Sequence, residues 1–238
     1  MSETGSMSVG DVTLVLLAGG AGSRMGKRKD LVRVCGMGLV AWMLERAAWC
    51  GPTMLVCAAD GTRVEGEERV DVAVRDEVSG EGPLRGVVTA MAACRTSTMV
   101  VVPIDMPGIG ARELAWVVER ARESPDAMCV MTRRMVNGAE RSEPFPSFYR
   151  SGFEDVARSR LHAGKRAMGG LMEEKAVCVV DAPREWGERV WANLNREDDV
   201  EKFEQDMMGD GDGATNTTRG LRQPEQVPIA PCHDRRDR

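Results

Sequence analysis

The sequence predicts an α/β domain of three layers, in which a mostly parallel β-sheet lies between two layers of helices. Short apolar runs alternate along the chain with longer segments that place apolar residues at helical spacing. The first of the short runs, VTLVLLA, is almost continuously apolar, as expected of a strand that is buried on both faces. The chain has 238 residues, 42% of them hydrophobic, which is enough for one sizeable core. Strands that alternate with helices favour a parallel sheet covered on both faces.

The first half of the chain shows this alternation most clearly. Proline in the first turn of the segment at 83–95 indicates the start of a helix. The segment at 111–123 is strongly amphipathic, and the run at 98–105 is the most strand-like in the chain. We expect strands at 12–18, 53–59, 70–76, 98–105 and 127–132, and helices at 38–50, 83–95 and 111–123.

The pattern is looser after residue 137. We expect strands at 146–150 and 176–181, and helices at 152–160, 166–174 and 196–208. The last 30 residues are polar, rich in glycine and proline, and have almost no apolar side chains to bury. The expected organisation is a flexible N-terminus at 1–10, one domain at 11–208 and a disordered tail at 209–238.

Composition argues against several classes of protein. The net charge of −5 argues against general nucleic-acid binding, which normally requires a basic protein. The N-terminal residues lack the pattern of a signal peptide, and no apolar run is long enough to span a membrane. Seven cysteines are scattered singly, which predicts reduced thiols and a cytoplasmic location. With only two histidines, the chain cannot form a histidine-rich metal site.

A glycine-rich loop, LAGGAGSRMGKRKD at 17–30, follows the first predicted strand. Successive backbone N–H groups in such a loop can hold phosphates, and the basic side chains supply countercharge. The alternative is a tight turn with a solvated basic face. The loop is not a Walker A motif, which requires G-x-x-x-x-G-K-[ST]. It also differs from a dinucleotide fingerprint, because Met25 replaces the third small residue and Glu45 falls within a predicted helix.

Four stretches, in chain order, resemble motifs of one family of small nucleotidyltransferases. The loop at 17–30 resembles L-A-[GA]-G-x-[GS]-x-R-M-G-x-x-K. RDEVSGEGPLRG at 75–86 resembles an aspartate followed by G-P-L-x-G, and VVVPIDMPGI at 100–109 resembles a strand that ends in D-x-P. WANLNREDDVEKF at 191–203 resembles N-x-N-[TS]-P-E-D-L. Together they resemble the molybdenum cofactor guanylyltransferases, the MobA family, over residues 12–203.

This resemblance implies a Rossmann-like nucleotidyltransferase fold and a defined reaction. A phosphate oxygen of molybdopterin attacks the α-phosphorus of GTP, which gives a pterin guanine dinucleotide and pyrophosphate, with Mg²⁺ as the assisting ion. Because the attacking phosphate is already ionised, no general base is needed. The implied partners are GTP and molybdopterin; other cofactor-biosynthesis proteins and molybdoenzyme chaperones are candidates for transient contacts, and neither nucleic acid nor membrane is expected.

The resemblance also assigns roles to individual residues. Arg24 and Lys29 neutralise charge on the phosphates, and Asp105 holds Mg²⁺ at the end of its strand. Asp76 lies on the nucleotide, near the ribose or the base. The implied substrate-binding residues are Leu17, Ala18, Gly19, Gly20, Lys29, Asp76, Gly82, Pro83, Leu84, Asp105, Asn193 and Asn195.

Each assignment has a structural alternative. Asp105 could cap the helix expected at 111–123, and Asp76 could be an ordinary loop residue. The glycines and proline at 82–86 could simply start a helix, and Asn193 and Asn195 could form a turn before the last helix.

The choice of base rests on Gly19. Guanylyltransferases of this type have L-A-G-G, whereas the related cytidylyltransferases usually have L-A-A-G, so the missing methyl group leaves room for a purine. Arg196 and Glu197 replace the usual Thr-Pro of the last motif, and Ala59 replaces an asparagine. Two alternatives therefore remain: transfer of cytidylyl or another nucleotidyl group to a different phosphate acceptor, and a member that binds nucleotide or pterin without turnover.

Overall fold

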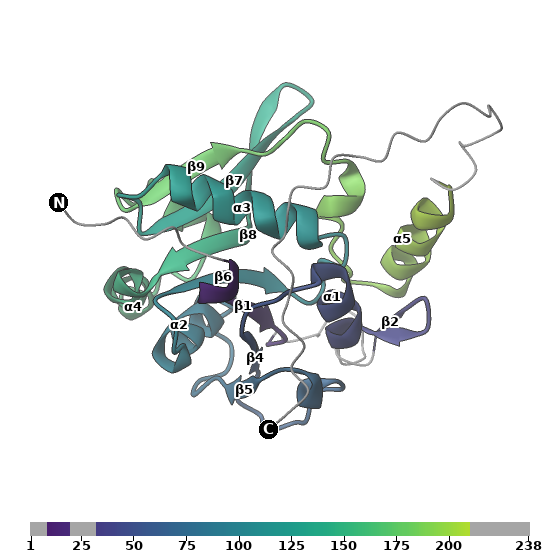
Figure 1. Cartoon of the computed structure of the whole chain (residues 1–238), viewed down its shortest axis with the longest axis horizontal. Coiled ribbons are helices and arrows are strands. Elements are labelled where there is room, and N and C mark those ends of the chain that lie inside the picture. Colours follow the sequence, from purple (N-terminus) through teal and green to yellow (C-terminus); the bar gives the residue numbers. More distant parts are fainter. Residues whose placement is uncertain (1–8, 20–31, 210–238) are drawn as a thin grey trace.

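The computed structural model describes residues 9–19 and 32–209. Its main sheet has seven strands in the order β5-β4-β1-β6-β8-β7-β9 (Figure 1). The strands are β1 Val12–Leu17, β4 Thr53–Cys57, β5 Val72–Arg75, β6 Thr98–Pro103, β7 Cys129–Val136, β8 Ala139–Arg150 and β9 Val177–Asp181. Only β8 is antiparallel to its neighbours; the other strands of this sheet run parallel. A two-stranded ribbon, β2 Arg33–Val34 with β3 Met37–Gly38, lies outside it.

Helices flank the sheet, which confirms the predicted α/β class with a mostly parallel sheet (Figure 1). α1 contacts α3, and α2 contacts α4. The α-helices are α1 Leu39–Ala47, α2 Pro83–Ala93, α3 Ala111–Glu123, α4 Glu154–His162 and α5 Glu197–Gly209. Short 3-10 helices are η1 Val9–Asp11, η3 Glu67–Arg69, η4 Ser151–Phe153, η5 Met168–Glu173 and η6 Glu188–Trp191. Within the described ranges, no helix is both long and apolar enough to cross a membrane.

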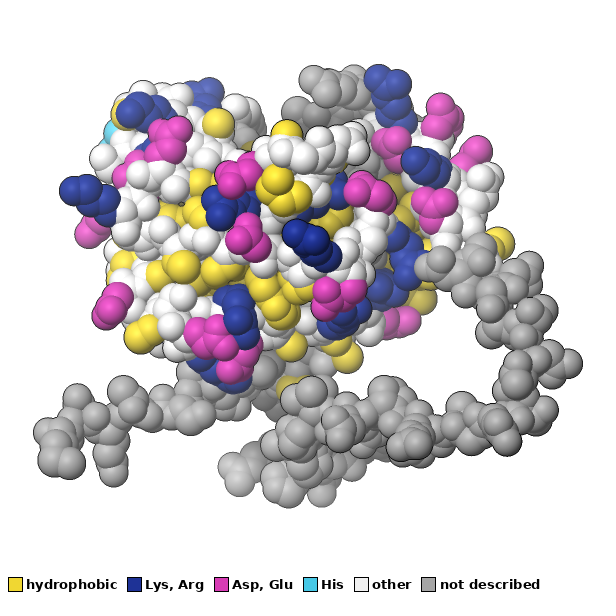
Figure 2. All heavy atoms as spheres, turned by 90° about the horizontal axis from the view of Figure 1, so that it is seen from above, with side chains coloured by type: hydrophobic (Ala, Val, Ile, Leu, Met, Phe, Trp, Pro, Cys, Tyr) yellow, Lys and Arg dark blue, Asp and Glu magenta, His cyan; other side chains and the backbone are white. Residues whose placement is uncertain are grey.

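The centre of the core is β1, whose six residues are all buried. A Cβ atom added to Gly86 of α2 would lie 3.1 Å from Cδ2 of Leu17, at the carboxyl end of β1. The absence of a side chain at Gly86 therefore lets α2 pack directly against the strand that leads into the glycine-rich loop. Basic and acidic side chains are interspersed on the face that Figure 2 shows.

Two predicted elements differ from the structure. The helix expected at 166–174 is instead the 3-10 helix η5, because Gly169 and Gly170 are poor α-helix formers in the middle of that segment. The short strand expected at 146–150 is the end of β8, which starts at Ala139 and pairs with β7 in a hairpin. Pro144 and Pro146 weaken the strand pattern of this segment, since proline has no N–H for the ladder.

A β-bulge accommodates these prolines. The β7–β8 register shifts between Val130, opposite Phe148, and Thr132, opposite Glu143. The residues at 144–147 therefore lie outside the regular ladder with β7. Bulges redirect side chains and are common beside functional sites. Here the bulge lies next to the carboxyl end of β6, because β8 pairs antiparallel with β6.

Candidate functional site

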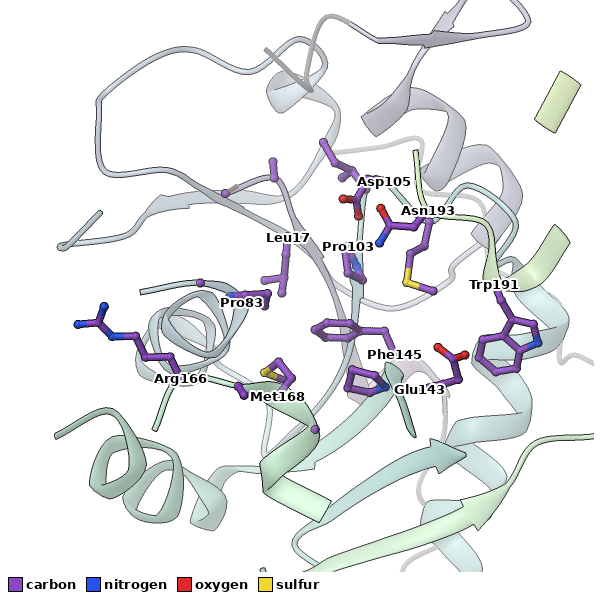
Figure 3. Close-up of a pocket in the computed structure, with 18 of the residues that line it drawn as sticks. Leu17, Pro83, Pro103, Asp105, Glu143, Phe145, Arg166, Met168, Trp191 and Asn193 are labelled. Carbon is purple, nitrogen blue, oxygen red and sulfur yellow. The ribbon is translucent and has the colours of Figure 1, made fainter. Parts of the chain in front are cut away.

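A cleft of about 620 Å³ lies at the edge of the sheet where β1 and β6 end (Figure 3). The carboxyl ends of parallel strands meet at one edge, which is where open α/β sheets bind ligands. Because β8 runs in the opposite direction, its first half reaches the same edge. The cleft is thus bounded by the residues that follow β1 and β6, the start of α2, the first half of β8, η5 and the segment around Asn193.

The structure brings most of the predicted site residues into this cleft. Those that line it are Leu17, Ala18, Gly19, Gly82, Pro83, Asp105 and Asn193. The side chain of Leu84 is fully buried in the core and does not line the cleft. Gly20, Arg24 and Lys29 lie outside the described residues, so their predicted roles remain predictions.

Asp105 lies two residues beyond β6 and is 9% exposed. The backbone N–H of Leu194 donates to the carbonyl of Asp105 at 2.8 Å, which joins this loop to the Asn193 segment. Figure 3 shows the Asn193 amide beside the Asp105 carboxylate. Asp105 does not cap α3, because the N-cap is Gly110, whose N–H donates to Oε2 of Glu113 at 2.9 Å. The helix-cap alternative for Asp105 is therefore wrong.

Asn193 and Asn195 point to the same side of their segment. Nδ2 of Asn195 donates to Oδ1 of Asn193 at 2.8 Å. The helix that follows starts without the Thr-Pro of the family motif, because Oδ2 of Asp199 accepts from the backbone N–H groups of Asn195 and Arg196, both at 2.8 Å. A carboxylate in the first turn that satisfies the first N–H groups is a common helix start. Asp199 thus satisfies the N–H groups at the start of α5 despite the departure at Arg196.

Asp76 follows β5 and lies next to Gly19. A Cβ atom at Gly19 would lie 3.4 Å from Oδ2 of Asp76 and 3.5 Å from the backbone nitrogen of Ala58. Thr89 of α2 donates its hydroxyl to Oδ1 of Asp76 at 2.6 Å, so the carboxylate is oriented by α2. Burial raises the pKa of Asp76, and the hydrogen bond from Thr89 opposes this shift. Asp76 does not itself line the cleft, and it lies beside the cleft only through its neighbour Gly19.

Replacing Asp76 with asparagine should raise the free energy of unfolding near pH 7.5, because the variant avoids burying a charge. In the wild type, the raised pKa means that the native carboxyl binds a proton at a higher pH than the unfolded one. The free energy of unfolding of the wild type therefore increases as the pH falls through the folded-state pKa. The gain in Tm of Asp76→Asn over wild type should therefore shrink between neutral pH and the ordinary aspartate pKa of about 3.9. Thermal melts over this pH range check it; a difference that does not change with pH would contradict the account.

The far wall of the cleft was missed by the sequence analysis. It consists mainly of residues from the first half of β8 and from η5 and η6, namely Arg141, Glu143, Pro144, Phe145, Arg166, Ala167, Met168, Gly169 and Trp191. The signal in the sequence was weak, because a proline-containing strand and a glycine-containing 3-10 helix carry little periodicity. Three of these side chains, Phe145, Met168 and Trp191, are large, apolar and at least nine-tenths buried.

Known proteins are similar to this chain in both sequence and fold. The family model of the MobA-like NTP transferase domain matches residues 14–205. The chain belongs to this family. A probable molybdenum cofactor guanylyltransferase of Opitutus terrae is 32% identical over 215 residues, 85% of this chain and 97% of that protein. One from Thermococcus sibiricus is 28% identical over 193 residues, 79% of this chain and 95% of that protein.

Solved structures agree on the fold of this MobA-like domain. The molybdopterin-guanine dinucleotide biosynthesis protein A of Archaeoglobus fulgidus superposes with a TM-score of 0.69 at 22% identity, over 83% of this chain and all of that one. A 4-diphosphocytidyl-2C-methyl-D-erythritol synthase of Anaerococcus prevotii superposes with a TM-score of 0.65 at 12% identity, over 85% of this chain. The MobA-like fold is thus shared by proteins named for guanine and for cytidine nucleotides.

Proposed function

We propose that this protein transfers GMP from GTP to the phosphate of molybdopterin in the molybdenum cofactor, with release of pyrophosphate. The observation that carries the proposal is the cleft itself, which brings together residues of all four family motifs. Gly19, Pro83, Asp105 and Asn193 come from four separate stretches of sequence and meet at one edge of the sheet. The names of the relatives support this choice of substrates.

The order of the strands suggests how the cleft divides between the two substrates. Gly19 lines the cleft after β1, and Asp76, which follows β5, lies next to Gly19. We assign this side of the cleft to the nucleotide. The first half of β8 bounds the opposite side, which we assign to the acceptor. Asp105 lies between them at the end of β6, the strand that separates β1 from β8. The α-phosphate of GTP would then lie near Asp105.

The donor set at Asp105 fits a divalent cation, and we propose Mg²⁺. Mg²⁺ binds through one or two carboxylates together with phosphates and water, and Asp105 supplies one carboxylate beside the amide of Asn193. No group of three or more His, Cys, Asp or Glu side chains suited to a metal occurs within residues 9–19 and 32–209. Bound there, Mg²⁺ would offset charge on the phosphates of GTP.

The remaining chemistry needs orientation rather than a base. An ionised phosphate oxygen of the acceptor forms a bond to the α-phosphorus of GTP, and the bond from the α-phosphorus to the bridging oxygen of pyrophosphate breaks. The chain must therefore hold two anionic substrates in line and stabilise charge on the leaving pyrophosphate. We assign this role to Arg24, Lys29 and the backbone N–H groups of residues 19–26. We also place the reaction in the cytoplasm, with transient contacts to proteins that deliver or receive the cofactor.

Melting curves in the presence of nucleotides test the choice of base. With Mg²⁺, GTP at 100 times its Kd should stabilise the protein by about 2.7 kcal/mol, and CTP and ATP should stabilise it less. Gly19→Ala should weaken the binding of GTP more than the binding of CTP, because the added methyl group would lie against Asp76 and Ala58, on the nucleotide side. Equal loss for both nucleotides would contradict this explanation. Stabilisation by CTP alone would favour a cytidylyltransferase, and binding of GTP without any turnover would favour a binding protein.

A further inference from the structure

One carboxylate on the acceptor side of the cleft has no role in phosphate chemistry. Glu143 of β8 lines the cleft and is only 8% exposed. A buried carboxylate costs free energy unless it is paired, and this one is held by two arginines. Nε of Arg134 lies 2.7 Å from Oε1 of Glu143, and Nε of Arg141 lies 3.2 Å from the same oxygen. Because both contacts fall on Oε1, Oε2 is the oxygen that the described residues leave to accept from a ligand.

The position of Glu143 is fixed from several directions. Its backbone carbonyl accepts from the hydroxyl of Thr132 at 2.7 Å, beside the β-bulge. Arg134 also lies 2.6 Å from Glu188 and stacks over the ring of Trp191, with its Cζ 5.1 Å from the ring centroid. The carboxylate is therefore rigidly placed relative to both the hairpin and the segment that leads to Asn193. Selective recognition of a ligand requires side chains that are held in one position. Glu143 is held more firmly than a carboxylate on the solvent-exposed surface.

The surroundings of Glu143 indicate the kind of group that it would bind. Figure 3 shows Phe145 and Trp191 on either side of Glu143, and Met168 beyond Phe145, so apolar side chains line the cleft around this carboxylate. A flat heterocycle fits apolar and aromatic walls, and a carboxylate oxygen among them accepts from an N–H on the edge of that ring. We propose that Oε2 of Glu143 accepts a hydrogen bond from the amino group of the acceptor's 2-amino-4-oxopyrimidine ring. This inference rests on the proposed function, which supplies a pterin as the acceptor.

Guanine has the same 2-amino-4-oxo edge, so GTP is the other source of this chemistry. The strand order favours the acceptor. Glu143 lies on β8, whereas Gly19 and Asp76 follow β1 and β5 on the other side of β6. A base held near Asp76 would be separated from Glu143 by the position of the phosphates at Asp105.

Direct binding of two small probes tests the proposal without any need for turnover. Pterin has the 2-amino group, and lumazine has a carbonyl oxygen in its place, which would face Oε2 with a second acceptor. Calorimetry on the full chain should show that the wild type binds pterin about tenfold or more tightly than lumazine. Glu143→Gln should lose most of this preference, because its amide can donate to the carbonyl of lumazine. Glu140→Gln, on the same strand and outside the cleft, should keep it.

Several results would overturn the proposal. They are equal binding of pterin and lumazine by the wild type, no measurable binding of pterin, or a preference that Glu143→Gln retains. The wild-type comparison decides the question even if Glu143→Gln folds poorly. Melts with GTP and with ITP, which lacks the 2-amino group, complete the test. If Glu143→Gln changes the preference for GTP over ITP, Glu143 reads guanine and the assignment to the acceptor is wrong. If GTP does not raise the Tm of the wild type, that result would instead contradict the proposed function.

Discussion

Replacing Asp105 with asparagine should lower the turnover of GTP and molybdopterin by about a thousandfold. Asp105 is the proposed metal ligand and lies at the end of β6, between the sides of the cleft that we assign to the nucleotide and to the acceptor. An amide keeps the shape of the side chain and removes the negative charge that a cation requires. Removing one preorganised electrostatic group at a reaction centre typically costs a factor of 10² to 10³, and loss of a metal ligand should be at the upper end.

The measurement is pyrophosphate release at saturating Mg²⁺, with Asp126→Asn as the matched control. Asp126 is exposed, precedes β7 and does not line the cleft. The control should retain wild-type turnover. Melting curves without nucleotide should show that Asp105→Asn is folded. An Asp105→Asn protein that keeps more than about a tenth of the wild-type rate would exclude Asp105 as the group that holds the cation.

Replacing Gly108 with alanine should destabilise the fold by about 1–3 kcal/mol and lower turnover as well. A Cβ atom at Gly108 would lie 1.9 Å from the carbonyl oxygen of Arg189 and 2.9 Å from Cα of Val190. Both obstacles are backbone, so the two segments would have to separate. These segments carry Asp105 and Asn193, which the Leu194–Asp105 hydrogen bond holds together. The alanine should therefore disturb the cleft as well as the packing.

Gly187→Ala is the control for Gly108→Ala. Gly187 lies in the same region, has a φ of −66° that any residue adopts, and has open space where its Cβ atom would be. Its substitution should change the free energy of unfolding by no more than about 0.5 kcal/mol. For a domain of this size, a loss of 1 kcal/mol lowers the Tm by about 2–4 °C, so melting curves resolve the two variants. Equal Tm values for Gly108→Ala and Gly187→Ala would contradict the close approach.

Part of the cleft could be predicted from the sequence because its residues lie at the ends of regular elements. Gly19 and Asp105 follow apolar runs that predict β1 and β6, and Pro83 occupies the first turn of a helix. Parallel strands bring their carboxyl ends to one edge, so spacing along the chain was enough to place these residues together. The resemblance to the family then supplied their chemical roles.

The wall formed by β8 and η5 could not be predicted in this way. Its residues depend on a β-bulge in β8 and on η5, and neither has a hydrophobic period that marks it in the sequence. In the sequence, Glu143 looks like an ordinary charged residue in a proline-containing segment. Its burial, its pairing with Arg134 and Arg141 and its place in the cleft arise only when β8 pairs with β6 and β7. These are long-range contacts, which local patterns do not encode.

The most direct test of the central claim is to incubate the purified protein with Mg²⁺, molybdopterin and GTP labelled at the α-phosphate, and to identify the labelled product. The account predicts label in a pterin guanine dinucleotide, formed in equal amount to the pyrophosphate released. It also predicts little or no product from CTP under the same conditions. Label that appears only with CTP, or that stays in GTP while the protein binds both substrates, would contradict the proposed guanylyl transfer.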